Sequence, residues 1–131
     1  MRTDSTRIAG EAIEEARQFI NSNFGKEYLP SKPNVYPSRK NAQGAHEAIR
    51  PTYFKYTPAS IKDLLSKDHF NLYQLIWNRF IACQMSPALL DQTSIKIEAV
   101  SSKPKSPQYL FQTTGSVIKF PGFIAVYTEA R

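Results

Sequence analysis

The first part of the chain spaces its hydrophobic residues at a helical period. Between residues 5 and 25 the apolar positions recur every three or four residues, at Ile8, Ala12, Ala16 and Phe19–Ile20. This spacing predicts an amphipathic helix that buries one face. Polar residues that could cap its start come just before it (Asp4, Ser5 and Thr6), and Gly25 stands where it would end.

Two more helices are predicted before residue 87, after a proline-containing loop over residues 26–41. In "TPASIKDLL", Thr57 is a candidate cap and Pro58 occupies the first turn of a short helix. The segment "SKDHFNLYQLIWNRFIACQM" carries hydrophobic residues on most sides of a helical wheel. It predicts a longer helix that is buried on most of its circumference, and Pro87 limits its extension.

Beyond Pro87 the hydrophobic period changes to two. "TSIKIEAV" alternates apolar and polar residues, which predicts a half-buried strand. "QYLFQTTGSVIKF" predicts a second strand with a bulge or bend at Gly115, and the segment after Pro121–Gly122 is open between a strand and a helical turn. The fold class is therefore mainly α with a C-terminal β segment (α+β). Two or three strands are few for an independent sheet, so we expect an excised chain whose strands complete a larger sheet.

Composition narrows the class of protein and partner. Charged residues make up 21% and hydrophobic residues 41% of the 131 positions, which is typical of a soluble globular protein. The net charge of +6 suits a polyanionic partner. No apolar run approaches the roughly 20 residues that span a bilayer, so no membrane partner is expected. The single Cys83 offers no internal disulfide and no zinc site, which favours a reducing compartment such as the cytoplasm.

The stretch "AHEAIRPT" concentrates ionisable residues before a proline. If it is helical, His46 and Arg50 share a face with Gln43, while Glu47 can reach Arg50 at i+3. One interpretation is a solvated turn with a Glu47–Arg50 ion pair, which is the commoner outcome for such a run. The other is a phosphate-facing edge, because arginine and histidine both donate hydrogen bonds to phosphate. The octapeptide alone leaves both interpretations open.

Four motifs carry a resemblance to a known family. "MRTDSTRIAGEAIEEARQFI", "EYLP", "NAQGAHEAIRPT" and "LYQLIWNRFIACQMSPA" follow one another in the order found in type IA DNA topoisomerases, specifically bacterial topoisomerase I. The resemblance runs from Met1 to about Ala88 and continues more loosely to the end. In that family the first motif begins one residue earlier, with the nucleophilic tyrosine. Here the sequence begins at the methionine, and whether Met1 is native or an added start is open.

The resemblance implies an isomerase. Such an enzyme cleaves one strand of DNA through a 5′-phosphotyrosyl intermediate, passes a strand through the gap and religates, relaxing negatively supercoiled DNA in the bacterial cytosol. Residues 1–87 resemble its helical catalytic domain, which is related to catabolite-activator-type helix-turn-helix folds. Residues 88–131 resemble part of its arch domain. The family's Mg²⁺ site belongs to a separate acidic domain, so we expect no cofactor here, and we expect the isolated chain to be inactive.

The resemblance also implies site residues. Arg2, Thr3 and His46 would be catalytic, and Asp4, Gln43 and Arg50 would contact phosphate or DNA. Arg2 would hold the scissile phosphate and its developing charge, and His46 would donate to the same or an adjacent phosphate. For Thr3 and Asp4, capping the following helix is about as good an interpretation. Glu47 is expected to orient its neighbours, because the substrate would repel a free carboxylate.

Several residues and two other functional classes stay open. Tyr28, Tyr36, Tyr53 and Tyr56 lie among basic residues and either stack on bases or simply pack. His69 is expected at the surface. A non-catalytic winged-helix module that binds single-stranded DNA or RNA would explain the charge and the order of helices and strands, but not the ordered motifs. A structural interaction domain would explain only the aromatic helix.

Overall fold

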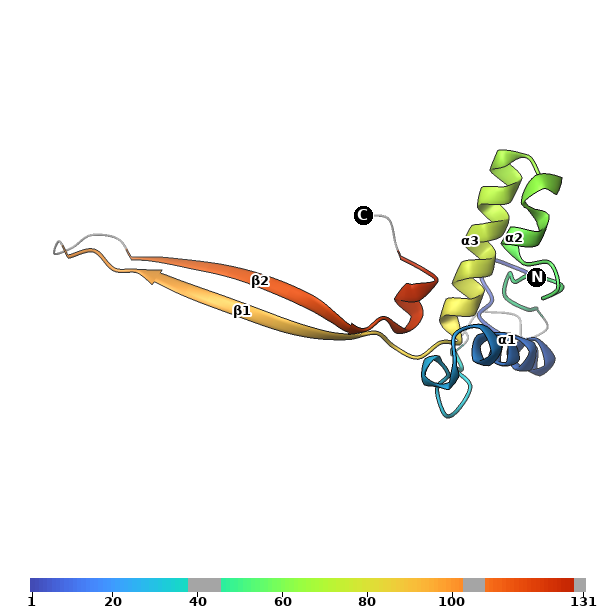
Figure 1. The fold of residues 1–131 in the computed structure, drawn as a ribbon, viewed down its shortest axis with the longest axis horizontal. Coiled ribbons are helices and arrows are strands. Elements are labelled where there is room, and N and C mark those ends of the chain that lie inside the picture. Colours follow the sequence, from blue (N-terminus) through green and yellow to red (C-terminus); the bar gives the residue numbers. More distant parts are fainter. Residues whose placement is uncertain (38–45, 103–107, 129–131) are drawn as a thin grey trace. The chain divides into compact units, whose positions relative to one another are not determined.

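The computed structural model describes residues 1–37, 46–102 and 108–128, and these form two compact units (Figure 1). The helical unit comprises Met1–Pro87 together with Gly122–Arg131, and the ribbon unit comprises Ala88–Pro121. The predicted α+β class is confirmed. The predicted segment 88–131 is not one unit, because the chain rejoins the helices from Gly122 onward. Assigning the two units to the catalytic and arch domains of topoisomerases stays a prediction.

Helix α1 (Gly10–Asn23) begins later than the hydrophobic period suggests. Residues 5–9 are not helical, and the backbone carbonyl of Arg7 instead accepts a hydrogen bond from the Ala48 amide at 2.8 Å. The N-cap is Ala9, whose side chain makes no capping bond, so the predicted caps Asp4, Ser5 and Thr6 are wrong. The buried face of the helix consists of Ala12, Ala16 and Ile20, as the period predicts. A short 3-10 turn (Lys26–Tyr28) follows.

Helix α2 (Pro58–Ile61) starts at the predicted cap, Thr57, and helix α3 (Lys67–Cys83) starts after Ser66, a cap that was not predicted. The Thr57 side chain accepts from the Ser60 amide, and the Ser66 side chain accepts from the His69 amide. Between the two helices lies a 3-10 turn (Lys62–Leu64). His69 is exposed, as expected.

Helix α3 is buried over its C-terminal half only. Trp77, Phe80 and Ile81 pack with the buried face of α1 in one hydrophobic core, where the Phe19 and Trp77 rings meet edge to face, with centroids 4.8 Å apart. Leu72, one helical turn and more before Trp77, is 57% exposed, and Leu75 is also exposed. The predicted burial on most of the circumference is therefore wrong for the first half of α3, which lies outside the core formed with α1.

The ribbon unit consists of strands β1 (Leu89–Ala99) and β2 (Tyr109–Phe120), paired antiparallel. Thr93 lies opposite Gly115 in regular register, so the predicted bulge at Gly115 is wrong, and the irregularity falls between Leu89 and Leu90. The first strand was expected to be half-buried, but β1 is exposed along its whole length. Because apolar and polar residues alternate along β1, one face of the ribbon is more apolar than the other. Among the described residues, no second layer covers that apolar face.

The chain leaves β2 through a tight contact at Gly122. This glycine has a positive φ of 50°, and a Cβ placed on it would lie 2.5 Å from the carbonyl oxygens of Ser86 and Pro87. A 3-10 turn (Gly122–Ala125) follows, so the segment that the sequence left open between a strand and a helical turn is a helical turn. The Phe123 amide donates to the Ser86 carbonyl at 3.0 Å and so joins this turn to the end of α3. No helix in the described ranges is long and apolar enough to cross a membrane.

Candidate functional site

The N-terminal motif and the His46 motif lie side by side. The Arg2 amide donates to the Glu47 carbonyl at 2.8 Å, and Arg2 and Ala48 form a parallel β-bridge. The segment from His46 to Arg50 is therefore extended, and the helical interpretation of "AHEAIRPT" is wrong. The backbone groups that would close a helical turn are bonded to the N-terminal segment instead.

Ser5 connects the two segments a second time. Its hydroxyl donates to the His46 carbonyl at 2.7 Å across 41 positions of sequence and accepts from the Arg7 amide at 3.3 Å. Ser5 is buried, so these bonds are shielded from water. They fix the backbone of His46, which is itself half-buried. The sequence offered no signal for this role, because a serine before an apolar run is more simply explained as a helix cap.

Arg2, Thr3 and Asp4 form an exposed turn at the start of the paired segment. Arg2 Nη2 lies 3.1 Å from Asp4 Oδ2, and both side chains are about half exposed. An exposed pair of this kind contributes little stability. The Arg2 guanidinium is consequently available to an anion that competes with Asp4, which is what phosphate binding requires.

Arg50 and Glu47 form a more enclosed pair. Arg50 Nη2 lies 3.0 Å from Glu47 Oε2, with the side chains only 16% and 22% exposed. Arg50 Nη1 also donates to the Pro51 carbonyl at 3.1 Å. The predicted Glu47–Arg50 ion pair is confirmed, although the backbone that carries it is not helical. Two of the donor groups of Arg50 are thus engaged within the chain, and its contact with phosphate stays a prediction. Gln43 lies outside the described residues.

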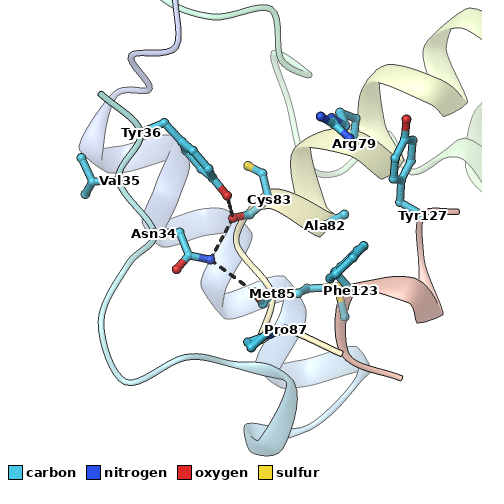
Figure 2. Close-up of a pocket in the computed structure, with 10 residues that line it drawn as sticks. All are labelled: Asn34, Val35, Tyr36, Arg79, Ala82, Cys83, Met85, Pro87, Phe123 and Tyr127. Atoms are coloured by element: carbon cyan, nitrogen blue, oxygen red, sulfur yellow. Dashed lines mark hydrogen bonds between the residues drawn. The ribbon is translucent and has the colours of Figure 1, made fainter. Parts of the chain in front are cut away.

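A cavity of about 540 Å³ lies at the C-terminal end of α3 (Figure 2). Figure 2 shows Asn34 and Tyr36 reaching the main chain there: Asn34 Nδ2 donates to the Cys83 and Met85 carbonyls at 3.0 and 3.2 Å, and the Tyr36 hydroxyl donates to the Cys83 carbonyl at 2.7 Å. Across the cavity the Arg79 guanidinium stacks over the Tyr127 ring, 4.9 Å from its centroid. Burial raises the pKa of the Cys83 thiol and of the Tyr36 phenol above their ordinary values.

These contacts anchor the loop after α1 to the end of α3. Tyr36, one of the tyrosines that sequence left open between stacking and packing, is engaged through its hydroxyl in this anchor. In the described ranges, no group of three or more His, Cys, Asp or Glu residues gathers closely enough to hold a metal ion. The Mg²⁺ site that the resemblance implies belongs to a separate domain, so no chemical step is assigned to a metal bound by this chain.

Comparison with known proteins decides the family. Residues 1–131 match the family model described as DNA topoisomerase. The chain belongs to the DNA topoisomerase family. It is 49% identical to DNA topoisomerase 1 of Campylobacter jejuni over 98% of its length and 48% identical to that of Rickettsia prowazekii over 99%. The resemblance of the four motifs to bacterial type IA topoisomerases is thereby confirmed.

A solved topoisomerase shares the fold. The chain matches full-length topoisomerase I from Thermotoga maritima with a TM-score of 0.73 and 38% identity, over 100% of this chain and 19% of that one. It spans 18% of the Campylobacter relative and 16% of the Rickettsia relative. This topoisomerase chain is therefore similar to a limited part of much longer proteins. The relation of its helices to helix-turn-helix folds stays a prediction.

Proposed function

We propose that this chain supplies the phosphate-holding side of the cleavage centre of a type IA topoisomerase. Such an enzyme cuts one DNA strand through a 5′-phosphotyrosyl intermediate, passes a strand and religates, so that negatively supercoiled DNA relaxes. One observation carries the proposal: the Arg2 segment and the His46 segment, far apart in sequence, are joined by backbone pairing. Two side chains suited to phosphate are thus held in neighbouring positions by a rigid backbone connection.

Phosphoryl transfer depends mainly on positioning and on charge stabilisation around the non-bridging oxygens. In this proposal the Arg2 guanidinium binds the scissile phosphate, exchanging its exposed contact with Asp4 for the substrate. His46 donates a ring N–H to the same or an adjacent phosphate. In the family motif the nucleophilic tyrosine precedes the methionine that stands here as Met1, which would place it two residues before Arg2.

The other predicted residues support this arrangement. Thr3 lies in the exposed turn between Arg2 and Asp4 and would help to hold it against the DNA. The enclosed Glu47–Arg50 ion pair carries no net charge, so it does not repel phosphate as a free carboxylate would. Gln43 and Arg50 remain proposed DNA contacts.

The substrate is proposed to be a single-stranded segment of negatively supercoiled DNA in the bacterial cytosol. The net charge of +6 supports a polyanionic partner. When Mg²⁺ is bound in the separate acidic domain that the resemblance implies, it supplies additional positive charge at the phosphates. Within this chain, the work of binding and orienting the phosphate would fall to Arg2 and His46.

Plasmid relaxation tests the proposal. A full-length topoisomerase I that carries this chain is expected to relax negatively supercoiled plasmid in the presence of magnesium, and denaturing it during the reaction should trap protein covalently on 5′ DNA ends. The 131-residue chain alone is expected to leave the plasmid unchanged, because it spans only 16–19% of the relatives. Relaxed topoisomers produced by the isolated chain, or trapping on 3′ ends, would contradict the proposal.

A further inference from the structure

The turn that follows the His46 segment displays two tyrosines and a lysine. Tyr53 is 60% exposed and Tyr56 is also exposed. Their rings meet edge to face with centroids 6.1 Å apart. Lys55 Nζ lies 4.9 Å from the Tyr56 ring centroid and 5.7 Å from that of Tyr53. Large aromatic surface is thus combined with a positive charge at a solvent-facing position.

The chain holds this turn in one conformation. Between the tyrosines, Phe54 packs against the core, with its ring centroid 5.6 Å from that of Phe80. The Tyr56 amide donates to the Tyr53 carbonyl at 3.3 Å, and the Tyr73 hydroxyl on α3 donates to the Tyr56 carbonyl at 2.6 Å. The two tyrosine rings are therefore positioned before any ligand binds, which lowers the entropy cost of binding.

A hollow of about 440 Å³ opens beside the rings. Both tyrosines line it, together with Ile61, Leu64, Leu65 and Tyr73. Its walls are mainly apolar and aromatic, and Lys55 is the charged group over the two rings. A flat aromatic ligand that carries negative charge fits such a surface, since its ring can stack while its anionic group meets the lysine.

We propose that Tyr53, Lys55 and Tyr56 form a base-stacking subsite for single-stranded DNA. The proposal rests on the proposed function, which supplies single-stranded DNA as the substrate. Tyr53 comes three residues after Arg50, so their Cα atoms lie at most about 11 Å apart. A strand that contacts the phosphate-binding segment can therefore extend onto the tyrosines. Stacking on tyrosine accepts any base, which suits an enzyme that acts at many DNA positions.

Binding to two oligonucleotides tests this subsite. The 131-residue chain is titrated with fluorescein-labelled oligothymidylate and with an abasic deoxyribose-phosphate oligomer of the same length, at one fixed low salt concentration. The parent is expected to bind the oligothymidylate more tightly. Tyr53→Ala should weaken oligothymidylate binding by at least about fivefold, the lower end of measured losses per stacked base, and should leave abasic binding unchanged.

Matched variants separate stacking from other effects. Tyr53→Phe keeps the ring and should retain the parent's affinity. Tyr109→Ala removes a tyrosine of similar exposure, 58%, from the ribbon unit and should change affinity less than Tyr53→Ala. Lys55→Ala should weaken binding of both oligomers, because it removes a phosphate contact. Melting temperatures are measured for each variant, and Tyr53→Leu replaces Tyr53→Ala if the latter unfolds.

Three results would overturn the subsite: parent-like oligothymidylate affinity of the Tyr53 variant, an equal loss on both oligomers, or an equal loss in Tyr109→Ala. A docking surface for protein would give the first of these. The outcome is independent of the plasmid assay. If the full-length enzyme relaxes plasmid and Tyr53→Ala binds normally, only the subsite is wrong. If it does not relax plasmid, the proposed function fails, and the comparison of the two oligomers still decides whether these tyrosines bind bases.

Discussion

Replacing Arg2 by alanine in a full-length topoisomerase that carries this chain is expected to slow plasmid relaxation by about 10- to 1000-fold, as for the loss of one charge-stabilising donor at a reacting oxygen. The guanidinium is half exposed and paired only with Asp4 among the contacts that the structure describes, so it can turn to the phosphate. The rate of relaxation of negatively supercoiled plasmid at fixed enzyme concentration is the measurement.

Two further variants make the Arg2 result specific. Arg2→Gln keeps most of the length and hydrogen-bonding ability but not the charge and fork geometry, so it should not restore the rate. Arg7→Ala removes the same charge from another exposed position of the N-terminal segment and should change the rate little. The melting temperature should stay near that of the parent in all three, because the Arg2–Asp4 pair is exposed. Parent-like relaxation by Arg2→Gln would exclude a role for its charge.

Replacing Trp77 by alanine is expected to lower the free energy of unfolding by about 3–5 kcal/mol, the usual cost of truncating a large buried aromatic residue. Trp77 is buried and lies in the core between α1 and α3. Its ring meets Phe19 edge to face, an arrangement that contributes beyond the buried area. Such a loss is a large part of the stability of an ordinary domain. Urea denaturation followed by circular dichroism measures it.

The same helix provides a control for Trp77. Leu72→Ala truncates a side chain that is 57% exposed on α3, and it should change the unfolding free energy by no more than about 0.5 kcal/mol. Both substitutions introduce alanine into the helix, so helix propensity does not explain a difference between them. Equal losses in the two variants would show that the core does not lie where the packing of α1 on α3 places it.

Features that depend on neighbouring residues were predictable from sequence. The cap Thr57 and the buried face of α1 follow from spacing and local hydrogen bonding, and the structure contains both. The Glu47–Arg50 ion pair was also predictable, because two long side chains three positions apart can meet on more than one backbone conformation.

Features that depend on distant partners were not predictable from the pattern. The late start of α1 and the extended His46 segment share one cause, which is pairing between residues more than 40 positions apart. The Ser5 hydroxyl takes part in that pairing and does not cap the start of a helix. Likewise, the hydrophobic period of α3 shows which positions are apolar but not how far α1 extends along it. Leu72 and Leu75 are consequently exposed against expectation.

The prediction that Arg2 and His46 lie near each other rested on the family resemblance and not on the hydrophobic periodicity. Periodicity suggested a helix that would align His46 with Arg50, whereas the structure sets the His46 segment beside Arg2 and leaves Arg50 bonded to Glu47. The resulting site has one exposed arginine and one half-buried histidine as its phosphate-facing candidates. A substitution of His46 therefore tests the proposed site most directly.

The relaxation rate of His46→Ala, compared with that of His69→Ala, tests the central claim most directly. Both variants lose one histidine, but His69 is an exposed residue in the first turn of α3, beside the Ser66 cap. The account predicts that His46→Ala relaxes negatively supercoiled plasmid about 10- to 1000-fold more slowly than the parent, while keeping its melting temperature. It predicts that His69→Ala relaxes plasmid at nearly the parent's rate. A His46→Ala enzyme that matches the parent and His69→Ala in relaxation rate would contradict a phosphate-binding role for the paired segments.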